Sequence, residues 1–227
     1  MIPFISIFDL NELSVRFPAV LFSLGVVILT YLLAKRLSED EKVGLFASFF
    51  MVISPWFFIF SRTGYEVTAG LMFYLLGIYL FLKINSINRF NFLLSMLSFI
   101  LSIYSYNSFR IITPLTILIL AIVERKNIVD QFKKGKLLVV LTLVLLILAF
   151  WPIYRLYIYD AGISRFQAVG GVTVEAFLKN YTSHFSLGFL FLDGDRNLRS
   201  QQSGFGQLYL PQLPFIIAGI IFLSQNQ

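Results

Sequence analysis

The chain has 227 residues, of which 58% are hydrophobic and only 13% are charged, and its mean hydropathy is +0.81. A soluble domain of this size needs far more charged surface, so the composition predicts an integral membrane protein. The apolar runs exclude a soluble nucleic-acid-binding protein, although the formal net charge is +6. The chain contains no Cys, which excludes disulfides, thiolate catalysis and cysteine-ligated metals.

In chain order, seven apolar runs are expected to form membrane-spanning helices. They cover residues 14–34, 43–60, 67–82, 90–106, 111–123, 137–154 and 208–223. A bilayer core takes about 20 helical residues, so residues 1–11 are too short to cross it and are expected to be an interfacial helix or the tail of a longer segment. The run 111–123 is also too short, so its span is expected to include the four residues before it. Arg110 would then either extend its side chain to the interface or face a water-filled cavity.

The Lys and Arg residues are unevenly divided among the connections between these runs. Ten of the eighteen fall in three short connections, and the alternate short connections hold one Arg each. The ten are Lys35, Arg36, Lys42, Lys83, Arg89, Arg125, Lys126, Lys133, Lys134 and Lys136, and the single arginines are Arg16, Arg62 and Arg110. Cytoplasmic loops are enriched in Lys and Arg. The bias therefore predicts an external amino terminus and an internal carboxyl terminus.

The run 90–106 carries Ser95, Ser98, Ser102 and Ser105 at spacings of three and four. This spacing places small hydroxyl side chains on one helix face, where another helix can approach closely. The expected fold is all-α, a polytopic integral membrane helical bundle of about seven transmembrane helices, with one long outer loop at 155–207. We expect a single domain over 1–227 in a multi-pass protein of a prokaryotic plasma membrane.

A polar island separates the second and third runs and carries Arg62 and Glu66, two opposite charges four residues apart. Charge beside hydrocarbon is costly, which makes the island a functional-site hypothesis. The alternative is an ion pair that caps a helix hairpin, with Glu66 favoured by the dipole of the helix that follows.

Two further polar clusters are expected on the same, outer side. One runs from Tyr106 to Arg110, and the other is the long loop with His184, Asp193 and Asp195. Arginines that face an outer cavity suit a phosphate ligand, because the guanidinium fork matches phosphate oxygens. Snorkelling at helix ends is the alternative for both Arg62 and Arg110.

Metal and nucleotide sites are weakly signalled. The triplet Asp193-Gly194-Asp195 imitates the start of a calcium loop, but Leu198 and Gly204 stand where that loop needs Gly and Glu. A turn is the favoured interpretation, and a divalent ion is the alternative. His184 has no second His beside it, so a zinc site is not predicted and a hydrogen-bonded loop histidine is favoured. No Gly-rich phosphate loop is present, so a cytoplasmic nucleotide sugar is not the expected substrate.

Several stretches resemble the polytopic glycosyltransferases of the protein mannosyltransferase and aminoarabinose transferase type, the family 39-like members of the GT-C class. These stretches are LNELSVRFP at 10–18, YLLAKR at 31–36, Ser54-Pro55 and Ser61-Arg62 with Glu66, YTSHFSLGFLFLDGD at 181–195 and GFGQLYLPQLP at 204–214. The resemblance implies transfer of a sugar from a polyprenyl-phosphate on the outer leaflet to a protein, lipid or glycan acceptor.

The resemblance also implies that an acidic residue in the first outer loop activates the acceptor. That loop should precede the span 14–34, and no Asp-Glu pair stands there. Asp9 and Glu12 fall in the part that resembles the end of the loop. We therefore expect the main acid upstream, in a member that is incomplete at its amino terminus and also lacks a carboxyl-terminal region.

The functional hypothesis assigns Glu66 as a second acid or orienting partner in catalysis. Arg62 and Arg110 are the candidate contacts of the lipid phosphate, and Tyr106 and His184 are further candidate substrate-binding residues. The expected partners are membrane lipid and a polyprenyl-phosphate-linked sugar donor, with the acceptor left open and no cofactor assigned. The competing hypothesis is a non-catalytic membrane fragment or a transporter or flippase-like bundle, although no internal repeat of the transporter kind is evident.

Overall fold

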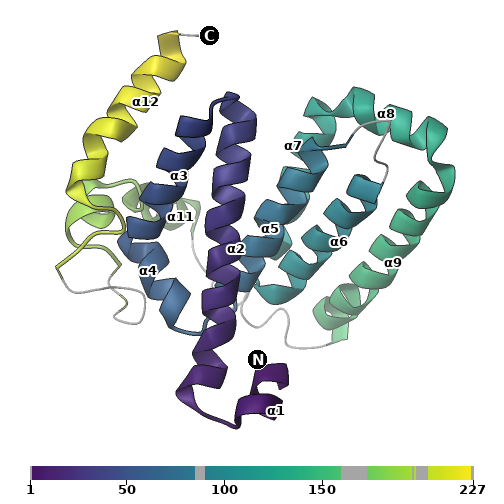
Figure 1. The fold of residues 1–227 in the computed structure, drawn as a ribbon, viewed down its shortest axis with the longest axis horizontal. Coiled ribbons are helices and arrows are strands. Elements are labelled where there is room, and N and C mark those ends of the chain that lie inside the picture. The colour runs from purple at the N-terminus through teal and green to yellow at the C-terminus, as the bar shows by residue number, and fades with distance from the viewer. Residues whose placement is uncertain (1, 85–89, 160–172, 196, 198–203, 226–227) are drawn as a thin grey trace.

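A computed structural model describes residues 2–84, 90–159, 173–195, 197 and 204–225 (Figure 1). These residues form helices and contain no strand, which confirms the all-α prediction. The α-helices are α1 (Ile2–Phe8), α2 (Glu12–Ser38), α3 (Glu41–Ile53), α4 (Pro55–Arg62), α5 (Val67–Leu82), α6 (Phe90–Ser105), α7 (Phe109–Val123), α8 (Arg125–Lys134), α9 (Lys136–Tyr159), α11 (Val174–Ser183) and α12 (Leu213–Gln225). A π-helix, η2, covers Gly188–Leu192, and a 3-10 helix, η3, covers Leu210–Gln212.

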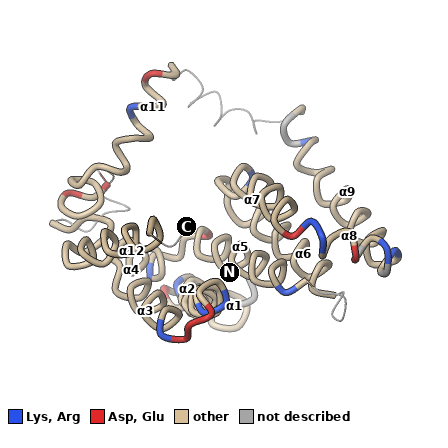
Figure 2. The backbone as a smooth tube through the Cα atoms, turned by 90° about the horizontal axis from the view of Figure 1, so that it is seen from above, with Lys and Arg blue, Asp and Glu red and all other residues tan. Residues whose placement is uncertain are grey.

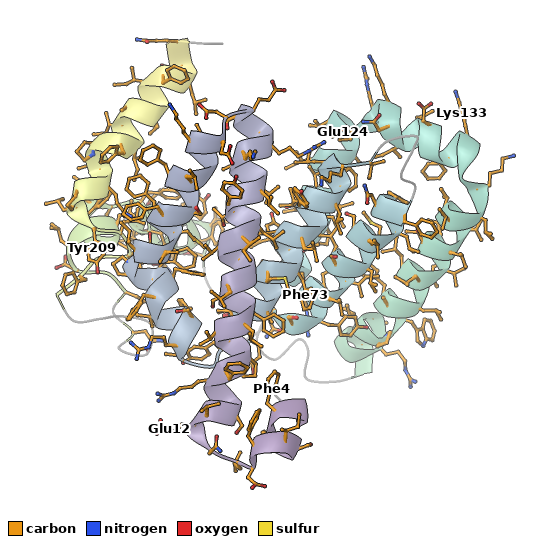
Figure 3. All side chains as sticks on the ribbon, viewed as in Figure 1. Phe4, Glu12, Phe73, Glu124, Lys133 and Tyr209 are labelled. Atoms are coloured by element: carbon orange, nitrogen blue, oxygen red, sulfur yellow. The ribbon has the colours of Figure 1, made fainter. Side chains whose placement is uncertain are left out.

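Successive apolar runs of the chain cross the bundle in opposite directions, so the connections gather at the two ends of the bundle (Figure 1). Helix α2 lies at the centre and packs against α3 and α5, and α5 packs against α6. Figure 3 places Glu124 and Lys133 at one end and Glu12 at the other. We call the first the basic end, because α2, α5 and α7 end there in the Lys-rich connections, and the second the cavity end.

Charged residues lie at helix ends and in connections, and the helix bodies are almost free of them (Figure 2). Within the described residues, two helices are long and apolar enough to cross a membrane, namely α2 and the Lys136–Arg155 part of α9. Helix α3 with α4 makes a third if this bent pair is one span. The other apolar helices are shorter, and the 16 residues of α5 measure only about 24 Å at 1.5 Å per residue. Each predicted apolar run contains a helix, but the count of seven spans stays a prediction.

The predicted span 43–60 is not one straight helix. Helix α3 ends at Ile53, and α4 starts at Pro55 after a bend of 65°. Proline has no N–H to continue a helix, and it restricts the residue before it to extended conformations, as seen in the φ of −64° and ψ of 129° at Ser54. A transporter built from inverted repeats would pair such a break with a second one; the described residues contain one bent pair.

The predicted outer loop 155–207 is partly helical. Helix α9 continues to Tyr159, and α11 and η2 follow within the described part of the loop. Residues 160–172, 196 and 198–203 of this loop lie outside the described residues.

The serine face of α6 is confirmed where α6 meets α5. The Ser95 and Ser102 hydroxyls each donate a hydrogen bond of 2.8 Å across the interface, to the carbonyls of Gly77 and Gly70. The two other serines donate to carbonyls of α6 itself; they are Ser98 and Ser105. Hydroxyl-to-carbonyl bonds of this kind need close backbones, which the glycines of α5 permit.

Cysteine labelling tests which end faces outward, since the chain has no background Cys. We expect Thr63→Cys and Ser108→Cys to react with an impermeant maleimide on intact cells, and Lys42→Cys and Lys126→Cys to react only after permeabilisation. All four positions are exposed. Thr63 is preferable to Gly64, whose φ of +70° strains any substituted residue. Reaction of Thr63→Cys and Lys126→Cys from the same side would contradict the predicted topology.

Candidate functional site

A polar cavity of about 750 Å³ lies at the cavity end. Its size is typical of small-molecule sites, which span roughly 300–1,000 Å³. Residues from the end of α4, the start of α5, the end of α6 and the segment after η2 line it: Phe60, Tyr65, Glu66, Val67, Tyr104, Ser105, Tyr106, Asn107, Asp195 and Asn197. Residues from each of the three polar clusters expected on one side of the protein therefore line one cavity, namely Glu66, Tyr106 with Asn107, and Asp195.

Glu66 occupies the position just before the first turn of α5. Its backbone carbonyl accepts from the Gly70 N–H at 3.0 Å, and its side chain makes no capping hydrogen bond. The carboxylate is exposed to the cavity at a helix end whose dipole favours negative charge. The alternative ion pair with Arg62 is not formed among the described side chains; the Arg62 guanidinium lies 5.0 Å from the centroid of the Phe58 ring instead.

The second polar corner reaches the cavity because Gly70 lacks a side chain. A Cβ at Gly70 would lie 2.6 Å from the Phe109 ring and 3.3 Å from the Tyr106 Cβ. The turn between α6 and α7 can therefore sit on the first turn of α5, one turn from Glu66. Within that turn the Phe109 N–H donates to the Tyr106 carbonyl at 3.1 Å. As a result Tyr106 and Asn107 line the same cavity as Glu66.

The third cluster is held against α4 by backbone hydrogen bonds. The Trp56 N–H donates to the Gln207 carbonyl at 3.3 Å, and the Leu208 N–H donates to the Leu190 carbonyl at 2.8 Å. These bonds fix the segment around η2 beside the start of α4. The Asp195 Oδ1 accepts from the Asn197 N–H at 3.0 Å, which is the expected turn of the Asp-Gly-Asp triplet. Both residues line the polar cavity.

A second cavity of about 550 Å³, which we call the arginine pocket, is lined by Arg16, Arg62, Thr63 and Tyr65. The two arginines come from α2 and α4. A Cβ at Gly64 would lie 3.3 Å from the Val15 carbonyl oxygen, so the turn after α4 packs directly on the first turns of α2. Arg16 also pairs with Glu12 at 3.4 Å on the exposed surface. Tyr65 lines both the arginine pocket and the polar cavity.

Arg110 and His184, the other two predicted substrate contacts, line neither cavity. Arg110 lies in the first turn of α7, and its Nε is buried without a hydrogen-bond partner. His184 lies at the end of α11 with its Nδ1 2.7 Å from the Asn180 carbonyl oxygen and its ring edge-to-face with Phe189. This geometry agrees with the favoured interpretation of a hydrogen-bonded loop histidine. In the described part of the chain, no three His, Asp or Glu side chains gather as metal ligands.

Arg16 and Asp195 were not selected as site residues from the sequence. The sequence marked Arg16 as the single arginine of its connection and as part of the stretch 10–18. It marked Asp195 as part of the polar cluster of the long loop and of an Asp-Gly-Asp turn. The alternation of helix directions is the signal that could have paired Arg16 with Arg62, because both lie at helix ends predicted to face the same side. The sequence placed Asp195 in a polar cluster expected on the same side as Glu66. No local pattern specified that the two residues line one cavity, because they lie far apart along the chain.

The helices and the site define an integral membrane protein with a polar, arginine-bearing site at one end of its bundle. The family model described as dolichyl-phosphate-mannose-protein mannosyltransferase matches residues 3–154, more than half of the chain, and the chain belongs to this family. Its members are GT-C glycosyltransferases that use a dolichyl- or polyprenyl-phosphate sugar donor. The resemblance seen in the sequence is thereby confirmed.

The matched range contains Arg16, Arg62, Glu66 and Tyr106, and it ends before the segment with Asp195. Searches of curated proteins and of solved structures gave no match.

Proposed function

We propose that the chain is a membrane glycosyltransferase that moves a sugar from a polyprenyl-phosphate donor to a protein, lipid or glycan acceptor on the extracytoplasmic side. Family membership supports the donor class. The observation that carries the proposal is the sharing of Tyr65 between the polar cavity and the arginine pocket. A donor that reaches from the arginine pocket past Tyr65 into the polar cavity would have its phosphate beside two arginines and its sugar beside carboxylates.

Arg62 and Arg16 are the proposed contacts of the donor phosphate. Both guanidinium groups are exposed, so two forks are available to the phosphate oxygens. When the bond between the sugar C1 and the phosphate oxygen breaks, the leaving polyprenyl-phosphate gains negative charge. Arginines placed at that oxygen stabilise the developing charge, which is a large term in enzymatic transfer reactions.

Glu66 is the proposed base of the reaction. An acceptor hydroxyl in the polar cavity would lose its proton to the carboxylate while its oxygen forms the new bond to the sugar C1. Asp195 lines the same cavity and is proposed to orient the acceptor or the sugar hydroxyls. Tyr106 offers a ring and a hydroxyl to the sugar. Arg110 and His184 line neither cavity, so the proposal gives them no role in it. Their substrate contacts stay predictions from the sequence.

Donor binding gives the direct test of the phosphate contacts. Membranes that hold the protein should bind and transfer sugar from one of a panel of radiolabelled polyprenyl-phosphate hexoses and pentoses. Arg62→Ala is expected to weaken donor binding roughly 10- to 100-fold, the loss of one hydrogen-bonded charged contact. Arg125→Ala removes the same charge at the basic end and should leave the dissociation constant unchanged.

The same assay can contradict the proposal in two ways. Unaltered donor binding in an Arg16→Ala, Arg62→Ala double variant would remove the arginine pocket from the site. Failure of folded protein to bind any lipid-linked sugar would remove the proposed donor.

A further inference from the structure

A third cavity of about 550 Å³ lies at the basic end, away from the proposed reaction site. It is enclosed by the ends of α2, α5 and α7 and the starts of α6 and α8. Among the described residues, its polar lining consists of two cations, two amides and one carboxylate: Arg36, Lys83, Asn91, Asn127 and Glu124. We call it the basic-end pocket.

Hydrogen bonds hold the polar side chains of this pocket in place. The Arg36 guanidinium donates to the carbonyl of Leu82 at the end of α5. The Asn91 amide donates to the Lys83 carbonyl at 2.9 Å. A guanidinium has five N–H donors, so the bond to Leu82 fixes Arg36 and leaves donors for a ligand. The two cations are thus brought to one pocket from α2 and from the end of α5.

The Glu124 carboxylate of the pocket is hydrogen-bonded to a neighbouring amide and not paired with a cation. The Glu124 Oε2 accepts from the Asn127 amide at 2.7 Å, and no ion pair joins Glu124 to Arg36 or Lys83 in the described chain. The Lys83 ammonium lies over the Tyr79 ring, 4.5 Å from its centroid. Two cations against one acid leave the pocket with net positive charge, which suits an anion.

Helix α8 shows what kind of surface adjoins the pocket. It lies across the ends of α7 and α9 (Figure 1) and exposes Lys126 and Lys133. Ile128 on the same helix packs against the apolar core cluster, whereas Val129 and Phe132 are nearly half exposed. Exposed apolar side chains beside cations are typical of a helix that lies in the interface of an anionic membrane.

We propose that the basic-end pocket binds the phosphate headgroup of an anionic phospholipid from the leaflet opposite the reaction site, with α8 lying on that leaflet. Basic pockets between membrane helices hold anionic headgroups in this way. Arg36 and Lys83 contact the phosphate, and the basic residues of α8 add to the local positive potential.

The test uses the full chain in detergent, titrated with short-chain phosphatidylglycerol and, for comparison, phosphatidylcholine and inorganic phosphate. Phosphatidylglycerol should bind most tightly. Lys83→Gln should raise its dissociation constant about fivefold, the loss of one near-surface cation. Glu124→Gln should lower the constant, since it removes the one acid among the described residues that line the pocket. Lys42→Gln, an exposed cation at the same end but outside the pocket, is the matched control.

Lys83→Gln is the primary variant because Arg36 also ties α2 to α5, so its loss can affect folding. Unchanged phosphatidylglycerol binding in Lys83→Gln, or weaker binding in Glu124→Gln, would overturn the proposal. Inorganic phosphate that binds as tightly as the lipid would overturn the assignment of a lipid. None of these measurements requires sugar transfer, so they stand apart from the proposed activity.

Discussion

Replacement of Glu66 by Gln is expected to lower the rate of sugar transfer roughly 10²- to 10⁴-fold, the usual contribution of a general base. Gln keeps the shape of the side chain but cannot accept the acceptor proton. Donor binding should be unchanged, because the proposed phosphate contacts lie in the arginine pocket. The turnover rate and the donor dissociation constant, measured on the same membranes, separate these two effects.

Glu175→Gln is the matched control for Glu66→Gln, since Glu175 is an exposed glutamate of α11 that lines neither cavity. It should transfer sugar at the parent rate. The alternative candidate for the general base is Asp195, which lines the same cavity as Glu66. If Asp195→Asn abolishes transfer while Glu66→Gln retains it, the base is Asp195 and the assignment of Glu66 is wrong.

The Gly77→Val variant is expected to lose about 1–3 kcal/mol of unfolding free energy, the usual cost of overpacking a core. A Cβ at Gly77 would lie 2.6 Å from two atoms of the Phe99 ring, and both residues lie where α5 meets α6. Relief requires the two helices to separate, which also stretches the bond from the Ser95 hydroxyl to the Gly77 carbonyl. Thermal unfolding of the purified protein measures the loss.

Gly219→Val provides the control, because Gly219 is in the apolar helix α12 and a Cβ there meets nothing within 4 Å. Its melting temperature should stay close to that of the parent. Phe99→Ala should cost less stability in the Gly77→Val background than alone, since contacting residues are energetically coupled. Equal melting temperatures for Gly77→Val and Gly219→Val would show that α5 and α6 are not closely packed.

Residue patterns predicted most helices and the two sets of helix ends. The serine spacing of α6 predicted a close interface, and Ser95 and Ser102 bond across it. Pro55 signalled an irregularity in the run 43–60, but not the 65° bend that divides it into two helices. The number of spans and the single domain over 1–227 stay predictions.

The site was predicted less completely than the helices. Tyr106 joins Glu66 in one cavity as expected, whereas Arg110, four residues later on the chain, lines neither cavity. Tyr106 lies in the turn after α6, whereas Arg110 lies in the first turn of α7 with its Nε buried. Proximity in sequence to a polar corner therefore does not place a residue inside it. Arg62 lines the arginine pocket together with Arg16 of α2.

The amino-acid sequence by itself determined the membrane class, the family, the helical runs and the separation of basic connections from the polar corners. Apolar transfer energy and loop charge are sums over neighbouring residues, so they can be read along the chain. Only the tertiary structure decided which polar side chains share a cavity. That outcome depends on close contacts between distant segments, such as Phe109 against Gly70 and the Gln207 carbonyl on α4, and no local pattern specifies those distances.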